Sequence, residues 1–572
     1  MPTPFTNIQT MQHFFQLDEE GERLIGKLSE RLRRLVHSAV DYNALIQPGR
    51  VLTYKLYMGE KWQYPRLTDT STLNGVLTEQ AGLDSFATFQ ATSTVKAKSL
   101  FSPHYFAGDE QIVDRNIRYL LLTPDGATDD DVEQNRPAGR YTHLYREIES
   151  AAPVFFDALR EAKRRRRERI GKTEINSFEP PTVARINSSE FSHHPWMEIA
   201  PGKAASDAPK AVIIAMHWLQ SGGAERWAME TVALARQAGL LPIVITDSDG
   251  HQPWITRHEF DDTVLLPLTM PLQDRVGDAP LLRALFEQFN IVGVLIHHCQ
   301  WMYDNAWWVK HYFPETHVVD SLHIVEYIFH GGYPSESVAR DEWIDLHHVI
   351  SPQLEHWLED VHHIDPKKVV DAPLVGLTAD SGTLAFKSRD VAKPLTISFV
   401  GRNVRQKRPE TFILAVRELN KKFPGKLRFI MQGNGDMDEF VDQLIKRYDL
   451  ETVIQRRSMT TPVSQTYDQT DVLLVSSMNE GITLTTIEAL SAGIPVISAN
   501  VGSQDTLIPP QGLCRRESAR FVRDVTAIVG RILESEENRK KLWEAEKNRL
   551  EKFSELKSAN EYFRDMLTKW SR

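Results

Sequence analysis

The sequence contains few cysteines and no long apolar segment. Its two cysteines, Cys299 and Cys514, lie far apart in a chain of 572 residues. This excludes a disulfide-stabilised scaffold and favours a reducing compartment. The longest apolar stretches, Ala211–Met216 and Ile291–Ile296, are much shorter than the roughly 20 residues of a membrane-spanning helix. The first residues show no basic segment followed by an apolar run, so we expect a cytoplasmic protein without a signal peptide.

An excess of positive charge is also lacking. The formal net charge is -10, which gives no overall attraction to nucleic acid, so no nucleic-acid partner is expected. The densest basic block is Lys163–Arg167. The solvated end of a helix is favoured for this block over a binding site for anionic lipid or nucleic acid. Peripheral membrane contact and oligomerisation stay open.

The length exceeds what one hydrophobic core supports and predicts about three compact units. Residues 1–170 are predicted as an accessory α+β region, and residues 171–208, with their Pro-Pro, Ser-Ser and His-His-Pro clusters, as a linker. The accessory region is expected to contain helical segments over Glu19–Leu45 and Ala152–Arg169 and strands over Arg50–Tyr57 and Ile117–Leu122.

Two series of short apolar segments alternating with helical segments follow the linker. In the first series, strands are predicted over Ala211–Met216, Leu241–Thr246, Val264–Leu268, Ile291–Ile296 and Val318–Asp320, with helices over Glu225–Gln237 and Pro280–Gln288. In the second, strands are predicted over Leu395–Val400, Leu427–Met431, Asp471–Ser476 and Ile494–Ser498, with helices over Pro409–Phe423 and Asp438–Tyr448. Such alternation is typical of a parallel sheet covered by helices. We therefore expect an α/β protein with two doubly wound, Rossmann-like domains, residues 209–378 and 379–555, facing a cleft, and a C-terminal helix over 556–572.

Three motifs follow predicted strands, where ligands bind in doubly wound folds. The first is Ser221-Gly222-Gly223-Ala224-Glu225, whose glycines let the backbone approach a phosphate at a helix N-terminus. A tight turn would use the same glycines. The second is Gly401-Arg402 followed by Lys407, a pair of cations suited to a diphosphate. A surface loop with ordinary basic residues is the alternative.

The third motif is the segment from Asp471 to Ser498, which contains NEGITLTTIEALSAGIPVIS. Glu480 lies in the loop after a strand, and Glu488 lies about two helical turns beyond it. Gly493 and Pro495 end the helix. Both carboxylates can therefore face one cleft, although the spacing alone also fits a loop acid and a solvated helix residue.

Together, GGAE, FVGR with its lysine, GNG at Gly433–Gly435, and the two-glutamate segment resemble the retaining GT-B glycosyltransferases of family four, the glycosyl transferases group 1. The resemblance covers roughly Ala211 to Glu551. It implies transfer of a sugar from a nucleotide-diphosphate sugar, UDP- or GDP-linked, with retention of anomeric configuration and without a metal or other cofactor. The implied enzyme is of the hexosyltransferase type. The acceptor would be a glycan, a lipid-linked glycan or a protein, with surface polysaccharide synthesis as the usual role.

The same resemblance assigns roles to individual residues. Glu488 would bind the donor ribose, and Glu480 would orient the transferred sugar. Arg402 and Lys407 would hold the diphosphate and stabilise the leaving group, and His323 would lie near the acceptor, with His297, His298 and His330 as competitors. The remaining donor-binding residues would be Gly222, Gly223, Gly433, Gly481, Ile482, Thr483 and Leu484. The alternatives are a noncatalytic GT-B-like binding or scaffold protein, or a nucleotide-sugar epimerase or a phosphorylase of the same architecture.

Overall fold

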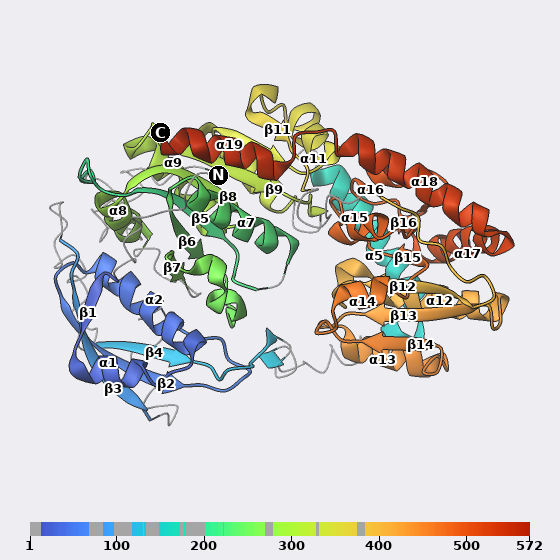
Figure 1. Ribbon diagram of the computed structural model, residues 1–572, viewed down its shortest axis with the longest axis horizontal. Helices are drawn as coiled ribbons and strands as arrows, with labels where there is room; N and C mark the ends of the chain where they lie inside the picture. Colours follow the sequence, from blue (N-terminus) through green and yellow to red (C-terminus); the bar gives the residue numbers. More distant parts are fainter. Residues whose placement is uncertain are drawn as a thin grey trace.

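The computed structural model describes residues 13–67, 84–96, 117–129, 131–132, 148–171, 177–178, 201–220, 222–268, 278–327, 331–374 and 384–572. Three sheets organise these residues: a four-stranded sheet near the N-terminus and two larger parallel sheets (Figure 1).

The N-terminal sheet has the strand order β1-β3-β2-β4. Its elements are β1 (Phe15–Leu17), α1 (Glu19–Ile25), α2 (Glu30–Ile46), β2 (Val51–Met58), β3 (Ala87–Ser93) and β4 (Ile117–Leu122). The helical segment expected over Glu19–Leu45 is divided into α1 and α2, because the Ser29 side chain accepts the backbone N–H of Leu32 and starts a new helix. Helix α2 packs on the middle sheet, next to β7 and α8.

The middle sheet is parallel throughout, in the order β11-β10-β9-β8-β5-β6-β7. Its strands are β5 (Lys210–Met216), β6 (Leu241–Thr246), β7 (Val264–Pro267), β8 (Asn290–His297), β9 (His317–Leu322), β10 (Leu346–Val349) and β11 (Val369–Asp371). Its helices are α7 (Gly223–Gln237), α8 (Asp278–Gln288), α9 (Gln300–Tyr312), α10 (Tyr333–Val338) and α11 (Pro352–His356).

The third sheet is also parallel, in the order β14-β13-β12-β15-β16-β17. Its strands are β12 (Leu395–Val400), β13 (Leu427–Gln432), β14 (Ile454–Arg457), β15 (Val472–Val475), β16 (Val496–Ala499) and β17 (Leu513–Cys514). Its helices are α12 (Pro409–Lys422), α13 (Asp438–Arg447), α14 (Val463–Tyr467), α15 (Leu484–Ser491), α16 (Gln504–Leu507), α17 (Ser518–Glu534) and α18 (Glu536–Phe553). The predicted fold class, two Rossmann-like sheets plus an α+β accessory region, is confirmed.

The parts of the protein built on the middle sheet and on the third sheet form two lobes, the middle-sheet lobe and the third-sheet lobe. Two helices cross between these lobes. Helix α5 (Pro153–Gly171) precedes the middle sheet in sequence but packs against α17 beside the third sheet (Figure 1). Helix α19 (Ala559–Ser571) follows the third sheet but packs on α7 and β8 of the middle sheet. The region predicted as accessory therefore packs on both lobes, through α2 on the middle-sheet lobe and through α5 on the third-sheet lobe.

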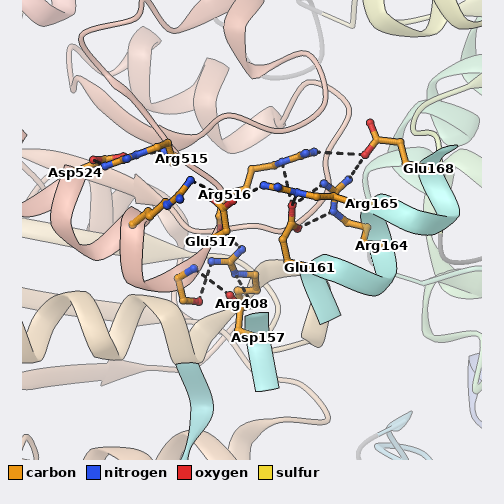
Figure 2. Close-up of polar contacts among 12 residues, drawn as sticks. Asp157, Glu161, Arg164, Arg165, Glu168, Arg408, Arg515, Arg516, Glu517 and Asp524 are labelled. Carbon is orange, nitrogen blue, oxygen red and sulfur yellow. Dashed lines mark hydrogen bonds and ion pairs between the residues drawn. The ribbon is translucent and has the colours of Figure 1, made fainter. Parts of the chain in front are cut away.

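The structure corrects the interpretation of the Lys163–Arg167 block as a solvated helix end at Arg164, whereas Lys163, Arg165 and Arg166 are exposed as that interpretation expects. The Arg164 side chain is 3% exposed and pairs with Glu161 at 2.8 Å and Glu168 at 3.0 Å. Arg165 pairs with Glu161 and also with Glu517, the residue that precedes α17 (Figure 2). Arg165 thus links α5 to the residue that precedes α17, while the ion pairs of Arg164 lie within α5. Within the described ranges, no helix is both long and apolar enough to cross a membrane.

Candidate active site

The two parallel sheets meet at the carboxyl ends of their strands. Gly481, in the loop after β15, lies so close to the loop after β9 that a Cβ atom there would be 2.0 Å from the carbonyl oxygen of His323. The neighbouring Asn479 donates from Nδ2 to the carbonyl of Val325 at 2.8 Å. Only glycine at position 481 allows this approach of the two backbones. The contact places His323 and the Glu480–Leu484 stretch on facing sides of one interface.

Lys407 and Glu480 form an ion pair at this interface. Lys407 ends the turn Arg405–Lys407 that follows β12, and its Nζ lies 2.6 Å from Glu480 Oε1. The Glu480 side chain is 7% exposed and that of Lys407 24% exposed. The structure thus brings together two residues that are 73 positions apart and that the sequence assigned to one site. A buried carboxylate paired with a less buried ammonium leaves hydrogen-bonding capacity on the lysine for a ligand.

Glu488, on α15, is held by two residues that the sequence analysis did not identify. The Tyr467 hydroxyl donates to Oε2 at 3.0 Å, and Arg226 of α7 lies 3.5 Å from Oε1. Burial, together with the Glu488 charge, raises the pKa of Tyr467, so the hydroxyl stays protonated and keeps donating. Arg226 follows the GGAE motif directly, and this adjacency was the available sequence signal. Glu488 therefore contacts both lobes.

Of the two predicted donor glycines of the middle sheet, Gly223 lies against the start of α15. A Cβ atom on Gly223 would be at ordinary contact distance, 3.6 Å, from Leu484 Cδ1. Gly222, the N-cap of α7, is covered by Glu225, whose Oε2 would lie 1.8 Å from an added Cβ. Burial raises the pKa of Glu225, while the charges of His217 and the exposed Arg402 act in the opposite direction. Arg402 is thus electrostatically coupled to the GGAE turn across the interface.

Gly433 has a packing reason for being glycine. Its φ is +154°, and a Cβ atom would lie 1.9 Å from the carbonyl oxygen of Gly401, so the ends of β12 and β13 touch there. Ile482 and Thr483 are buried, and Thr483 is the N-cap of α15, with its hydroxyl accepting from Gln504 at 2.9 Å. The Thr483 side chain makes no capping bond to α15. Their donor-binding roles stay predictions.

His323 points into the middle-sheet lobe. Its Nε2 is 3.1 Å from Ser321 Oγ, and its ring meets that of His298 edge-on at 4.9 Å. Burial and the neighbouring His298 and His348 lower the pKa of His323 well below its usual value, so the imidazole is neutral. Its competitor His297 is buried and His298 is partly buried, each with a pKa lowered to about 3 chiefly by desolvation, and His330 lies outside the described residues.

An Asp-x-Asp sequence after a strand was missed. Asp247-Ser248-Asp249 follows β6 directly. Asp247 is buried, accepts the backbone N–H of Trp301 near the start of α9 at 2.9 Å, and lies 3.7 Å from His217 Nδ1. Burial raises its pKa. Asp247 therefore supports α9. In the described part of the chain, no group of three or more His, Cys, Asp or Glu residues is arranged to hold a metal ion.

Comparison with known proteins identifies the class of the C-terminal part. Residues 380–549 match the family model described as Glycosyl transferases group 1, so the chain carries a domain of that family. This range contains Arg402, Lys407, Glu480 and Glu488.

Individual relatives are glycosyltransferases. The chain is 31% identical over 134 residues, 23% of its length and 25% of the other, to the UDP-N-acetylglucosamine--peptide N-acetylglucosaminyltransferase GtfA subunit of Streptococcus pneumoniae. It is 27% identical over 237 residues to the D-inositol 3-phosphate glycosyltransferase of Corynebacterium kroppenstedtii, 36% of this chain and 52% of that one. The chain thus spans about half, or less, of these relatives. The Anabaena protein HepE, solved with UDP, is 14% identical with a TM-score of 0.49, over 63% of this chain and 98% of that one.

Proposed function

We propose that this protein is a retaining glycosyltransferase of family four that transfers a sugar from a nucleotide-diphosphate sugar to an acceptor. The observation that carries the proposal is the Lys407–Glu480 ion pair of 2.6 Å, next to the point where Gly481 touches His323 of the other lobe. A cation and a carboxylate at the carboxyl ends of two neighbouring parallel strands, next to a loop of the other lobe, suit a ligand with a diphosphate and a sugar. The match of residues 380–549 to the group 1 family supports the same chemistry.

The chemistry asks the protein to stabilise a leaving nucleoside diphosphate. Lys407 and Arg402 would donate charge-assisted hydrogen bonds to its phosphates, and the N–H groups at the start of α15 would add to them. Such preorganised donors in a partly dry site give the largest kind of electrostatic stabilisation. Glu488 would accept from the ribose hydroxyls, and Glu480 would orient the sugar beside the leaving group. Neutral His323 would stand on the acceptor side.

The donor would carry UDP or GDP, and the relative named for UDP-N-acetylglucosamine favours UDP. The acceptor would be a surface polysaccharide or another glycan. These relatives, named for peptide and inositol phosphate acceptors, belong to a group with varied acceptors. No metal and no other cofactor would be needed.

The test measures release of nucleoside diphosphate from UDP-glucose, UDP-N-acetylglucosamine and GDP-mannose, with and without a glycan mixture. We expect one donor to be consumed with the product anomer retained, as read by proton NMR. Binding of a nucleotide without turnover of any donor would indicate the noncatalytic alternative, and conversion of the free donor sugar without an acceptor would indicate an epimerase. A donor at about 100 times its dissociation constant adds about 2.7 kcal/mol of stability, so a thermal shift selects the nucleotide first.

A further inference from the structure

The segment 148–171 lies beside the loop that carries Lys407. Residues 148–151 form a helical turn and α5 follows, packed on α17. The Asp157 carboxylate accepts the first backbone N–H of α17, from Ser518, at 3.0 Å. These residues therefore belong to the third-sheet lobe, although about 230 positions separate them from β12 in sequence.

Two acids of this segment hold the arginines on both sides of Lys407. Glu149 accepts two hydrogen bonds from the Arg405 guanidinium, at 2.5 and 3.1 Å, and its side chain is 1% exposed. Asp157 lies 3.6 Å from the Arg408 guanidinium, and both side chains are almost fully buried (Figure 2). A two-point arginine–carboxylate contact fixes direction as well as distance. Buried charges of this kind depend on their partners, because an unpaired buried charge is strongly destabilising.

The opposite side of the 405–408 loop contacts the Glu480 loop. The carbonyl of Gln406 accepts the backbone N–H of Met478 at 2.8 Å, and its side-chain amide donates to the Asn479 carbonyl at 3.1 Å. Lys407, between these contacts, reaches Glu480. The loop is thus held between two acids on one side and the residues that precede Glu480 on the other.

Arg408 keeps a backbone conformation that needs this support. Its φ is +52°, the left-handed region, which a non-glycine residue adopts at a cost of about 1 kcal/mol or more. The guanidinium is anchored by Asp157, by the Ser518 hydroxyl at 3.0 Å and by the Arg516 carbonyl at 2.5 Å. Loss of the acid removes its only carboxylate partner among the described ion pairs. The turn at Lys407 would then relax toward a less strained conformation.

We propose that Glu149 and Asp157 are positioning residues of the donor site: through Arg405 and Arg408 they fix the turn that presents Lys407 to the donor diphosphate. The inference rests on the proposed function, because it needs Lys407 to bind the donor. It makes the 148–171 segment a part of the sugar-donor site that the family match to residues 380–549 does not include.

Glu168 supplies a matched control on the same helix. It pairs with Arg164 at 3.0 Å and lies 3.9 Å from Arg516, and none of its ion pairs within the described residues reaches the Arg405–Lys407 turn. Glu168→Gln therefore weakens the docking of α5 while leaving both acids at the Lys407 loop in place. Glu149→Gln and Asp157→Asn remove the two charges and keep the side-chain shapes, and Asp157→Asn keeps an oxygen for the Ser518 N–H.

The experiment is a double-mutant cycle read by UDP titration of the full-length protein, with GDP as a second probe. We expect Glu149→Gln and Asp157→Asn to weaken nucleotide binding about tenfold, as loss of a support behind a ligand-binding residue commonly does, while Glu168→Gln stays within about twofold. In the Lys407→Ala background, Glu149→Gln is expected to have no further effect, because its influence passes through the lysine.

Each outcome decides between the ideas. If Glu149→Gln weakens nucleotide binding by the same factor in the wild-type and Lys407→Ala backgrounds, the positioning role is overturned and a structural role remains. The same holds if the variant lowers the melting temperature without changing the affinity for nucleotide. If Glu149→Gln does not fold, Asp157→Asn and its combination with Lys407→Ala give the same test. Failure of the wild-type protein to bind either nucleotide refutes the proposed function itself, and is seen before any variant is compared.

Discussion

Replacing Gly481 with alanine tests the close approach of the two lobes. The new Cβ would lie 2.0 Å from the His323 carbonyl oxygen, where ordinary contact begins near 3.4 Å, so the two loops must separate by about 1.4 Å. The contact would join the new Cβ to a backbone carbonyl oxygen, so neither atom can move away by rotation of a side chain. Overpacking of this size costs about 1–3 kcal/mol.

The functional effect should exceed the effect on stability. A displacement of about 1 Å at a reacting centre can reduce the rate about 100-fold, and Gly481 adjoins both Glu480 and the start of α15. We expect kcat/KM for sugar transfer to fall by about 10- to 100-fold, measured as nucleotide release from the donor identified by thermal shift.

Gly250→Ala is the control, since its Cβ would meet no atom closer than 3.5 Å. It should leave both activity and melting temperature near the wild-type values. Full activity of Gly481→Ala, with Gly250→Ala equally active, would refute the idea that the lobes work in the closed arrangement seen at His323.

Three further predictions concern single side chains. Glu488→Ala should weaken binding of the donor by about 1.5–3 kcal/mol, seen as a rise of about 10- to 100-fold in the dissociation constant for UDP, and an unchanged constant would contradict the ribose role. Arg402→Ala should lower kcat more than it raises KM, because its charge acts mainly on the leaving diphosphate, and unchanged turnover would exclude it from the site. Burial opposes protonation of His347, but Asp320 at 3.1 Å and Asp341 at 3.0 Å raise its pKa to about 9. Because the folded-state pKa exceeds the unfolded value near 6.5, the stabilisation is complete below about pH 6.5 and is lost as pH rises through about 9. Chemical denaturation of wild type and His347→Gln should therefore show a difference in unfolding free energy that shrinks by about 3 kcal/mol between these pH values, and a constant difference would contradict the assignment.

The regular parts of the fold could be predicted from the sequence because they depend on local patterns. Buried parallel strands such as Leu241–Thr246 are short apolar runs bounded by turns, and β6 has these bounds. Six strands were missed: β1, β3, β10, β11, β14 and β17. Strand β11 has three residues, and β14 is Ile-Gln-Arg-Arg, whose polar residues give no apolar run.

Residues of the site could be predicted only where a chemically suitable side chain follows a predicted strand. Lys407 and Glu480 follow two neighbouring strands, β12 and β15, and their meeting follows from sheet order. The direction of the His323 ring could not be predicted, because it depends on the packing of His298, which follows another strand, as well as on the nearby Ser321.

The position of α5 could not be predicted for a different reason. Its basic block has the composition of an exposed helix, and the acids that neutralise it include Glu517, more than 350 positions away. Composition reports the charges on a helix but not the distant segment that neutralises them.

The exchange of α5 and α19 between the lobes makes assembly a property of the whole chain. The Asp157–Ser518 hydrogen bond spans 361 positions, and that between Glu230 and Asn560 spans 330. During synthesis, the middle sheet is complete long before α19 leaves the ribosome. Helix α5 is likewise synthesised long before α17, against which it packs. Contacts of such sequence separation slow folding and expose unfinished surfaces meanwhile. A fragment cut at the boundary between the two sheets would leave each half without a helix that the other half encodes.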